Sequence, residues 1–187
     1  MVRYVLCLGM IIFGSRAYAQ IQVASELGYA QDSSGYGSST STGKTIVGLS
    51  LYMPFKSGSP IAIGFEYLQN SGNGVSSTGS EVSYVTTSPL FGVQCLMGPK
   101  DLYRLYLSYS PIVRSEIKVA NSLQSWTGSA TQIRFALAPL LTDKLALIVG
   151  VNYYAASFTE RSGAASNVSA YDQVYVSPSL GLSYSFK

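Results

Sequence analysis

The chain has 187 residues, of which 47% are apolar and only 11% are charged, and it contains no histidine. A typical soluble domain carries about 25% charged residues, so much of this protein is expected to face something other than water. The lack of histidine excludes enzymes that need a histidine base and most zinc enzymes, and no other nucleophile with a base is recognisable. We therefore expect no catalytic activity, no metal and no other cofactor.

The first 19 residues have the pattern of a secretory signal peptide. Arg3 precedes an apolar run from Tyr4 to Phe13, which is followed by Ala17-Tyr18-Ala19. About ten apolar residues form only about 15 Å of helix, half of a hydrocarbon core, so the run is too short for a membrane anchor. The sequence predicts a signal peptide over residues 1–19 and one domain over residues 20–187.

The predicted mature chain is almost neutral. Without Arg3 and Arg16 it has 10 basic and 9 acidic residues, which predicts no binding to nucleic acid. Cys95 is then the only cysteine, so no intramolecular disulfide can form. The longest uninterrupted apolar run is 145–151, far short of a spanning helix. A closed β-barrel is the other structure that satisfies every backbone group in lipid.

Alternation of apolar and small polar residues predicts eight strands. The clearest alternation places Val174, Val176, Pro178, Leu180, Leu182, Tyr184 and Phe186 on one face of the last strand. Similar patterns occur over 22–29, 46–55, 61–67, 81–96, 103–109, 133–137 and 145–153. A soluble barrel would carry charge on its outer face. The last strand has no charge between Asp172 and Lys187, so its apolar face is expected to contact lipid.

The connections between these strands alternate in length. Short ones lie at 56–60, 97–101 and 142–144, and long ones rich in Gly, Ser, Thr and Asn lie at 33–43, 70–80, 120–128 and 160–170. Short periplasmic turns and long external loops are typical of outer membrane barrels. The sequence therefore predicts an all-β fold: a closed, antiparallel, eight-stranded transmembrane β-barrel with both termini in the periplasm.

Proline interrupts several of the predicted strands. The residues are Pro89, Pro111, Pro139 and Pro178. Because a closed barrel has no free edge for a residue without an N–H, we expect bulges at these positions. A bulge near Pro89 would also explain a change of apolar phase along 81–96. The inward or outward facing of residues around all four prolines stays open.

With this pattern the chain resembles the small eight-stranded outer membrane proteins, the group that includes the OmpA transmembrane domain, OmpX and OmpW. The signal, the eight strands, the four loops and the terminal segment from Leu180 to Phe186 carry the resemblance over the whole mature chain. In that group, a final strand that ends in Phe is recognised by the barrel assembly machinery; here Lys187 follows the Phe. The resemblance implies that Leu180, Leu182, Tyr184 and Phe186 form this assembly signal. It also implies an integral monomer in the outer membrane of a Gram-negative bacterium, surrounded by lipopolysaccharide and phospholipid.

If apolar positions face outward, four charged residues on four different strands face into the lumen. They are Glu26, Glu66, Arg104 and Arg134. An eight-stranded barrel is only wide enough for side chains to fill, so we expect the four to pair as an ion cluster. The cluster could close the barrel permanently or act as a transient gate, and a mistaken facing is the third possibility.

Two further sets of inward residues are predicted. Tyr52 and Tyr106 are expected to hydrogen-bond to the ion cluster, and Arg114 and Glu116 are expected to form a second inward pair nearer the external loops.

These features specify an architecture more closely than a function. The polar lumen favours a structural or surface-exposed role. Transport of a small hydrophobic ligand or of ions, as in the OmpW group, is the first alternative. The second is an adhesin or partner-binding role, which would depend on the loop aromatics Tyr36, Trp126 and Phe158.

Overall fold

The computed structural model describes residues 21–32, 40–56, 58–75, 79–119, 122–163 and 170–186. The predicted signal peptide, Tyr36 and Lys187 lie outside this part of the chain. The strands are β1 (Ile21–Asp32), β2 (Thr40–Pro54), β3 (Ile61–Val75), β4 (Glu81–Met97), β5 (Tyr103–Val119), β6 (Ser122–Leu137), β7 (Leu145–Gly163) and β8 (Tyr171–Phe186). A short 3-10 helix, η1 (Pro99–Asp101), precedes β5. No helix in the described residues is long and apolar enough to cross a membrane.

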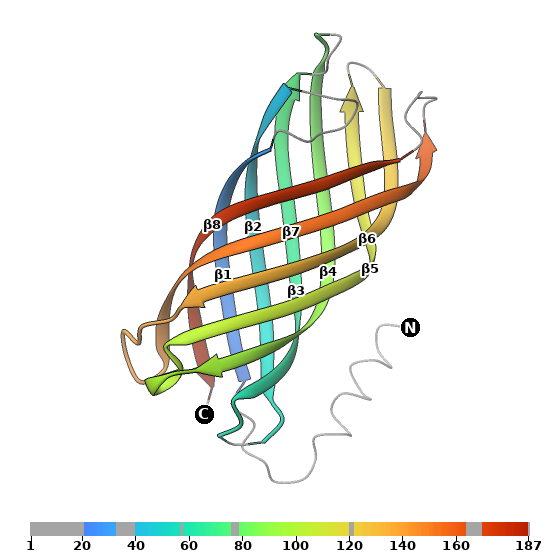
Figure 1. The fold of residues 1–187 in the computed structure, drawn as a ribbon. Helices are drawn as coiled ribbons and strands as arrows, with labels where there is room; N and C mark the ends of the chain where they lie inside the picture. The colour runs from blue at the N-terminus through green and yellow to red at the C-terminus, as the bar shows by residue number, and fades with distance from the viewer. Residues whose placement is uncertain are drawn as a thin grey trace.

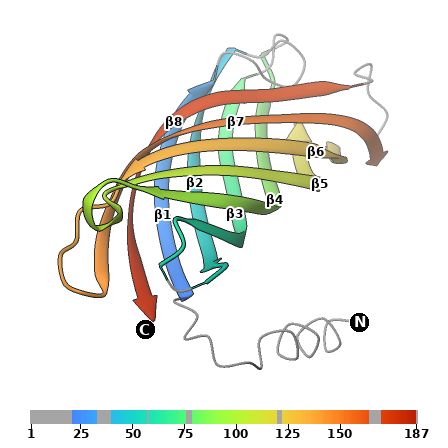
Figure 2. The same cartoon turned by 60° about the horizontal axis from the view of Figure 1, so that its bottom comes forward.

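The eight strands form one closed antiparallel ring. Each strand pairs with its neighbours in the chain, and β1 pairs with β8 to complete the ring (Figure 1). The start of β1 and the end of β8 lie at the same end as the β2–β3, β4–β5 and β6–β7 connections; we call this the terminal end (Figures 1 and 2). The opposite end is the loop end. The predicted eight-stranded closed barrel is confirmed.

The two faces of the barrel differ as the alternation predicts. Outward apolar side chains form an apolar belt that includes Leu27, Val47, Leu49, Leu51, Ile63, Phe65, Tyr67, Phe91, Leu107, Tyr109, Ile133, Phe135, Val149, Val151, Tyr153, Val176, Leu180 and Leu182, all of them exposed. Outward charged side chains such as Glu81, Lys118 and Asp172 lie toward the loop end. An uncharged belt bounded by charged positions matches the lipid-facing band of transmembrane barrels.

Several strands extend beyond their predicted limits at the loop end. β3 continues to Val75, β6 begins at Ser122 and β7 continues to Gly163. The segment 120–128, predicted as a long loop, is therefore largely strand. Above the apolar belt the backbone ladder still holds the strands together, but lipid no longer requires an apolar residue at every second position. Strands there lack the pattern by which they could be recognised.

A β-bulge in β5 changes the facing of its upper half. Ser110 pairs with Ala130 and Val113 pairs with Gly128, so β5 has one residue more than β6 between these pairs. Pro111 lies inside this interval and has no N–H for the ladder, which is why the extra residue is accommodated there. Beyond the bulge, odd-numbered residues of β5 face the lumen.

The other prolines are accommodated differently. β4 keeps a single phase past Pro89, so Val82 and Tyr84 face the lumen and the predicted change of phase does not occur. Pro139 lies after the end of β6. Pro178 stays in the regular alternation of β8, and the β1–β8 ladder ends beside it at the pair Gly28 and Ser179.

Closure by β8 should make the barrel resistant to detergent until it is heated. Unheated and boiled samples are expected to migrate differently on a denaturing gel. Deleting residues 184–187 removes the partners of Ile21, Gln22 and Val23, so the unheated folded band should disappear. Deleting Lys187 alone is the control and should leave that band intact. Identical migration of heated and unheated full-length protein would contradict a closed ring.

Candidate functional site

The charged side chains inside the barrel lie on widely separated strands. Glu26 is on β1, Glu66 on β3 and Arg134 on β6, and at most 8% of each residue is exposed. Arg134 forms an ion pair with Glu26 Oε1, and its Nη2 lies 3.3 Å from Glu66 Oε2. One guanidinium thus bridges two carboxylates and connects β6 with β1 and β3 through the lumen.

Two hydroxyl groups complete the surroundings of Glu66. Tyr52 on β2 and Ser108 on β5 each donate a hydrogen bond of 2.5 Å to Glu66 Oε1. Tyr106 on β5 lies beneath Arg134, whose guanidinium carbon is 3.6 Å from the ring centroid. The rings of Tyr52 and Tyr106 also contact each other edge to face, with centroids 5.4 Å apart. From here on, the ion cluster means the six residues observed together: these five and Glu26. They come from five of the eight strands.

Glycines on neighbouring strands make room for these long side chains. A Cβ on Gly64 would lie 2.6 Å from the Tyr52 ring, and one on Gly92 would lie 2.9 Å from the Tyr52 hydroxyl. A Cβ on Gly181 would lie 2.6 Å from Cγ of Glu26. The side chains of Tyr52 and Glu26 therefore occupy space next to glycine backbone. A larger residue at any of these glycines would collide with them.

The fourth predicted member of the ion cluster, Arg104, does not pair with a glutamate. It is buried in the lumen, but its Nη1 donates a 3.1 Å hydrogen bond to Ser183 Oγ on β8 instead. Both glutamates are engaged by Arg134, which lies two residue pairs nearer the loop end on the adjacent strand. The prediction of four mutually paired charges is corrected in this respect.

The pair predicted to face the lumen near the loop end lies on the outer face of the barrel instead. Arg114 and Glu116 are exposed on the outside of the barrel, and their neighbours Val113, Ser115 and Ile117 fill the lumen. The bulge at Pro111 is the reason, because one inserted residue reverses the facing of every side chain beyond it.

A second layer of side chains fills the lumen nearer the loop end. Phe158 stacks on Tyr171 with centroids 4.5 Å apart, and Trp126 meets Tyr171 edge to face at 5.2 Å. Tyr154 stacks on Tyr175 at 5.0 Å. We call these five residues the aromatic layer. Trp126 and Phe158 are both fully buried rather than in exposed loops, so the basis predicted for an adhesin is wrong for these two residues.

Polar contacts tie the aromatic layer to further strands. Ser88 on β4 and Tyr154 on β7 share a 2.7 Å hydrogen bond. Lys44 on β2 is 1% exposed, and its Nζ lies 5.4 Å from the ring centroid of Tyr84 and 5.0 Å from that of Tyr175. The sequence analysis did not predict this lysine. Its even-numbered phase on β2, shared with Tyr52, is the signal that could have placed it inside.

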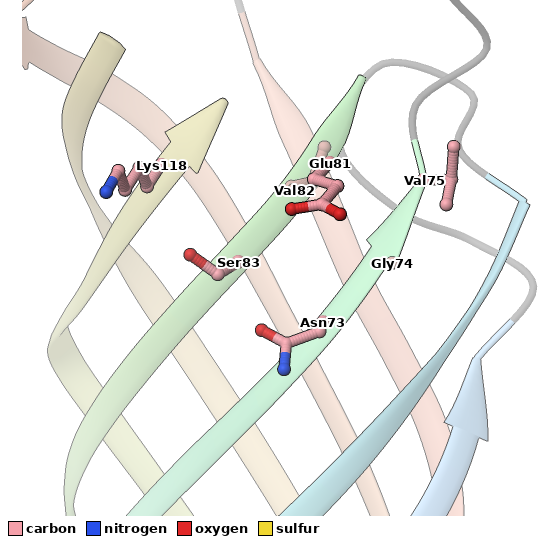
Figure 3. A pocket seen from close by; sticks show the side chains of 7 residues that line it. All are labelled: Asn73, Gly74, Val75, Glu81, Val82, Ser83 and Lys118. Atoms are coloured by element: carbon pink, nitrogen blue, oxygen red, sulfur yellow. The ribbon is translucent and has the colours of Figure 1, made fainter. Parts of the chain in front are cut away.

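The outer surface carries a groove at the loop end of β3, β4 and β5. It has a volume of about 530 Å³ and is lined by Asn73, Gly74, Val75, Glu81, Val82, Ser83 and Lys118 (Figure 3). An amide, a hydroxyl, a carboxylate and an ammonium group thus belong to the residues that line one groove, above the apolar belt. No cluster of three or more Cys, Asp or Glu that could hold a metal ion is present in the described ranges.

The predicted assembly-signal residues all lie on the outside of β8. Leu180, Leu182, Tyr184 and Phe186 are exposed by 39 to 58%. Tyr184 and Phe186 contact each other edge to face with centroids 4.8 Å apart. The residues therefore form one continuous outward row at the terminal end, next to the seam with β1.

The sequence matches no protein-family model and no curated protein. The structure, however, is similar to several solved barrels. Neisserial surface protein A aligns with a TM-score of 0.58 and 14% identity over 89% of this chain and 97% of that chain. OprG, an outer membrane protein from Pseudomonas aeruginosa, aligns at 0.51 and 10% identity over 91% and 97%. Ail, the attachment invasion locus protein of Yersinia pestis, aligns at 0.50 and 10% identity over 90% and 97%.

At such low sequence identity, the structural similarity establishes the fold but not the functional role. The alignments span nearly the full length of each solved barrel, so the whole closed ring is shared rather than a few strands. The chain has the fold of the small eight-stranded outer membrane β-barrels.

Proposed function

We propose that this chain is an integral, monomeric outer membrane protein that acts through its structure or its exposed surface, with a lumen closed by its own side chains. The observation that carries the proposal is the bridge from Arg134 to Glu26 and Glu66. It crosses the lumen, and all three of its residues are buried. An open pore would leave these groups in water.

The outer face supports membrane integration. An uncharged apolar belt encircles the barrel, and the closed ring leaves no sheet edge within it. In the proposal, phospholipid and lipopolysaccharide surround the belt, residues 1–19 are removed on export, and the barrel assembly machinery recognises the outward row on β8. The terminal end then faces the periplasm and the loop end faces the outside.

The lumen supports a role other than transport. The ion cluster and the aromatic layer lie in series along the barrel axis, so a solute would have to displace both. The groove at the loop end supports a surface role, because its polar groups stand outside the apolar belt, where an external partner could reach them (Figure 3). No catalytic role is proposed, since the sequence has no histidine.

Orientation can be tested with single cysteines in a Cys95→Ser background. In intact cells, Lys118→Cys at the loop end should react with a membrane-impermeant thiol reagent. Lys100→Cys at the terminal end, where the native lysine is also exposed, should react only after the outer membrane is permeabilised. The labelled protein should fractionate with outer membranes and begin at Gln20. Recovery as a soluble periplasmic protein would contradict the proposal.

Conductance tests the two closing layers. In planar bilayers the wild-type protein should show little steady current. Because the layers lie in series, truncating Glu26, Glu66 and Arg134 to alanine should open the lumen only when Trp126 and Phe158 are truncated as well. Arg114→Ala, on the outer face, is the matched control and should leave the current unchanged. Large, stable wild-type channels that none of these changes alters would favour transport.

Stability tests the bridge itself. Arg134→Ala should lower the free energy of unfolding by about 3 to 5 kcal/mol, because it leaves buried carboxylates without their cation. Glu26→Ala should also destabilise, and the double variant should lose less than the sum, with a coupling of about 1 to 3 kcal/mol. Urea unfolding in lipid vesicles measures all three. Additivity within about 0.5 kcal/mol would show that the pair contributes no specific interaction.

A further inference from the structure

We infer that the outer face of β5 at the loop end binds a phosphorylated glycolipid of the outer leaflet, together with the divalent cation that its phosphates carry. Three consecutive outward positions of this strand, Arg114, Glu116 and Lys118, have alternating charge, and all three are exposed. We call them the charged strip. The inference rests on the proposed orientation, in which the loop end faces the outside.

The charges of the strip are available to groups outside the protein. No carboxylate of the described residues lies within ion-pair distance of Arg114 or Lys118. Outward positions two residues apart on a strand are separated by about 7 Å, at 3.3 Å per residue. The strip therefore presents positive, negative and positive charge at regular intervals along the barrel wall.

The strip begins where the apolar belt ends. Ile112 and Tyr109, the outward residues that precede it on β5, are 57% and 52% exposed. Tyr109 also lines an apolar groove of about 970 Å³ on the outside of β2 to β5, together with Phe65 and Phe91. Charged groups directly above a hydrocarbon-facing surface lie at the level of lipid headgroups. A lipid whose phosphate contacts Arg114 would place its acyl chains against the belt below.

Grooves with polar groups border the strip on both sides. The groove of β3, β4 and β5 lies beside Lys118, which pairs with Ser83 (Figure 3). A second groove, of about 510 Å³, lies beside Thr127, the partner of Arg114 on β6. Its lining includes four serine or threonine hydroxyls and the carboxylate of Glu160. Hydroxyls, amides and carboxylates hydrogen-bond to sugar hydroxyls, so the two grooves suit the sugars of a glycolipid.

The balance of charge distinguishes between anionic lipids. The strip and its two grooves contain two cations, Arg114 and Lys118, but three carboxylates, Glu81, Glu116 and Glu160. This face therefore has no excess of positive charge with which to attract an anionic phospholipid. It suits instead a lipid that brings both phosphates and divalent cations, because phosphates that lie close together repel one another unless cations stand between them.

Each member of the strip has a role in this complex. Arg114 and Lys118 donate charge-assisted hydrogen bonds to phosphate oxygens. Glu116, between them, provides a carboxylate oxygen to the divalent cation that the phosphates share. Mg²⁺ is commonly bound in this way, by one or two carboxylates and the phosphates of a ligand. The alternating charges of the strip thus match a phosphate, a cation and a second phosphate in order.

The test measures binding of lipid A that carries two phosphates to the folded protein in neutral detergent with magnesium, by native mass spectrometry. The wild type should retain the lipid. Arg114→Gln with Lys118→Gln should weaken binding by about 25-fold, because each cation near a lipid surface contributes about fivefold. Lys56→Gln with Lys100→Gln removes the same charge from exposed lysines at the terminal end and should leave binding unchanged. Equal weakening in both double variants would overturn the proposal.

Magnesium separates the role of Glu116 from that of its neighbours. The wild type should bind lipid A more tightly in magnesium than in a chelator. Glu116→Gln should remove most of this difference, and in the chelator it should bind more tightly than the wild type, because a carboxylate that repels phosphate is gone. Asp172→Asn, an exposed acidic position on β8, is the matched control and should keep the wild-type response. An unchanged magnesium response in Glu116→Gln would contradict the shared cation.

Other occupants of this face give different results. Equally tight binding of phosphatidylglycerol would show that any anionic lipid suffices, which the proposal does not allow. A lipid-free dimer that Arg114→Gln with Lys118→Gln dissociates would assign the face to a second copy of the chain. The labelling of Lys118→Cys in intact cells locates the loop end without any added lipid. Correct labelling together with no retained lipid A would therefore refute this site and leave the proposed function standing.

Discussion

The guanidinium of Arg134 holds the inside of this barrel together. Pairing between strands satisfies the backbone, but it leaves an interior that side chains must fill. A charge in that interior is tolerable only with partners, and Arg134 finds two carboxylates and an aromatic ring on three other strands. Glu66 in turn needs the hydroxyls of Tyr52 and Ser108. The charges and hydroxyl groups of the cluster therefore compensate one another's burial through these contacts.

This arrangement depends as much on missing side chains as on those present. In so narrow a ring, the side chain of Tyr52 or Glu26 has room only because neighbouring strands have no side chain at that level. Gly64 and Gly92 provide the space for Tyr52, and Gly181 provides it for Glu26. The same complementarity of long and small residues gives native packing in any core. Here it also decides which strands a long side chain can contact.

The inside and outside of the barrel obey different physical requirements. Contact with lipid requires only that outward residues be apolar and uncharged, so a similar apolar belt is expected in any protein of this architecture. Polar side chains in the lumen need specific hydrogen-bond or ionic partners, because they are buried away from water. A lumen filled in two layers leaves the outer surface and the loop end as the regions that can meet other molecules, which is consistent with a structural or surface role.

Eight strands, their antiparallel closure and the outward face of most membrane-spanning parts could be predicted from the sequence. Lipid imposes a period of two that is visible locally in most of these strands, and the inward facing of Glu26, Glu66, Arg134 and Tyr52 follows from it. Which of these residues contact one another depends on the three-dimensional fold. Arg134 and Glu26 are 108 positions apart in the chain, and no local pattern distinguishes Arg134 from Arg104 as the partner of the glutamates.

The sequence also did not predict whether side chains at the loop end face the lumen or the outside. The bulge at Pro111 reverses the phase of β5, so Arg114 and Glu116 point outward, and the position of a bulge depends on the neighbouring strands as well as on the proline. Trp126 and Phe158 lie in segments rich in small polar residues, which have the composition of loops. They are strand residues in the lumen because backbone pairing continues above the belt, where lipid no longer imposes the alternation that makes a strand recognisable.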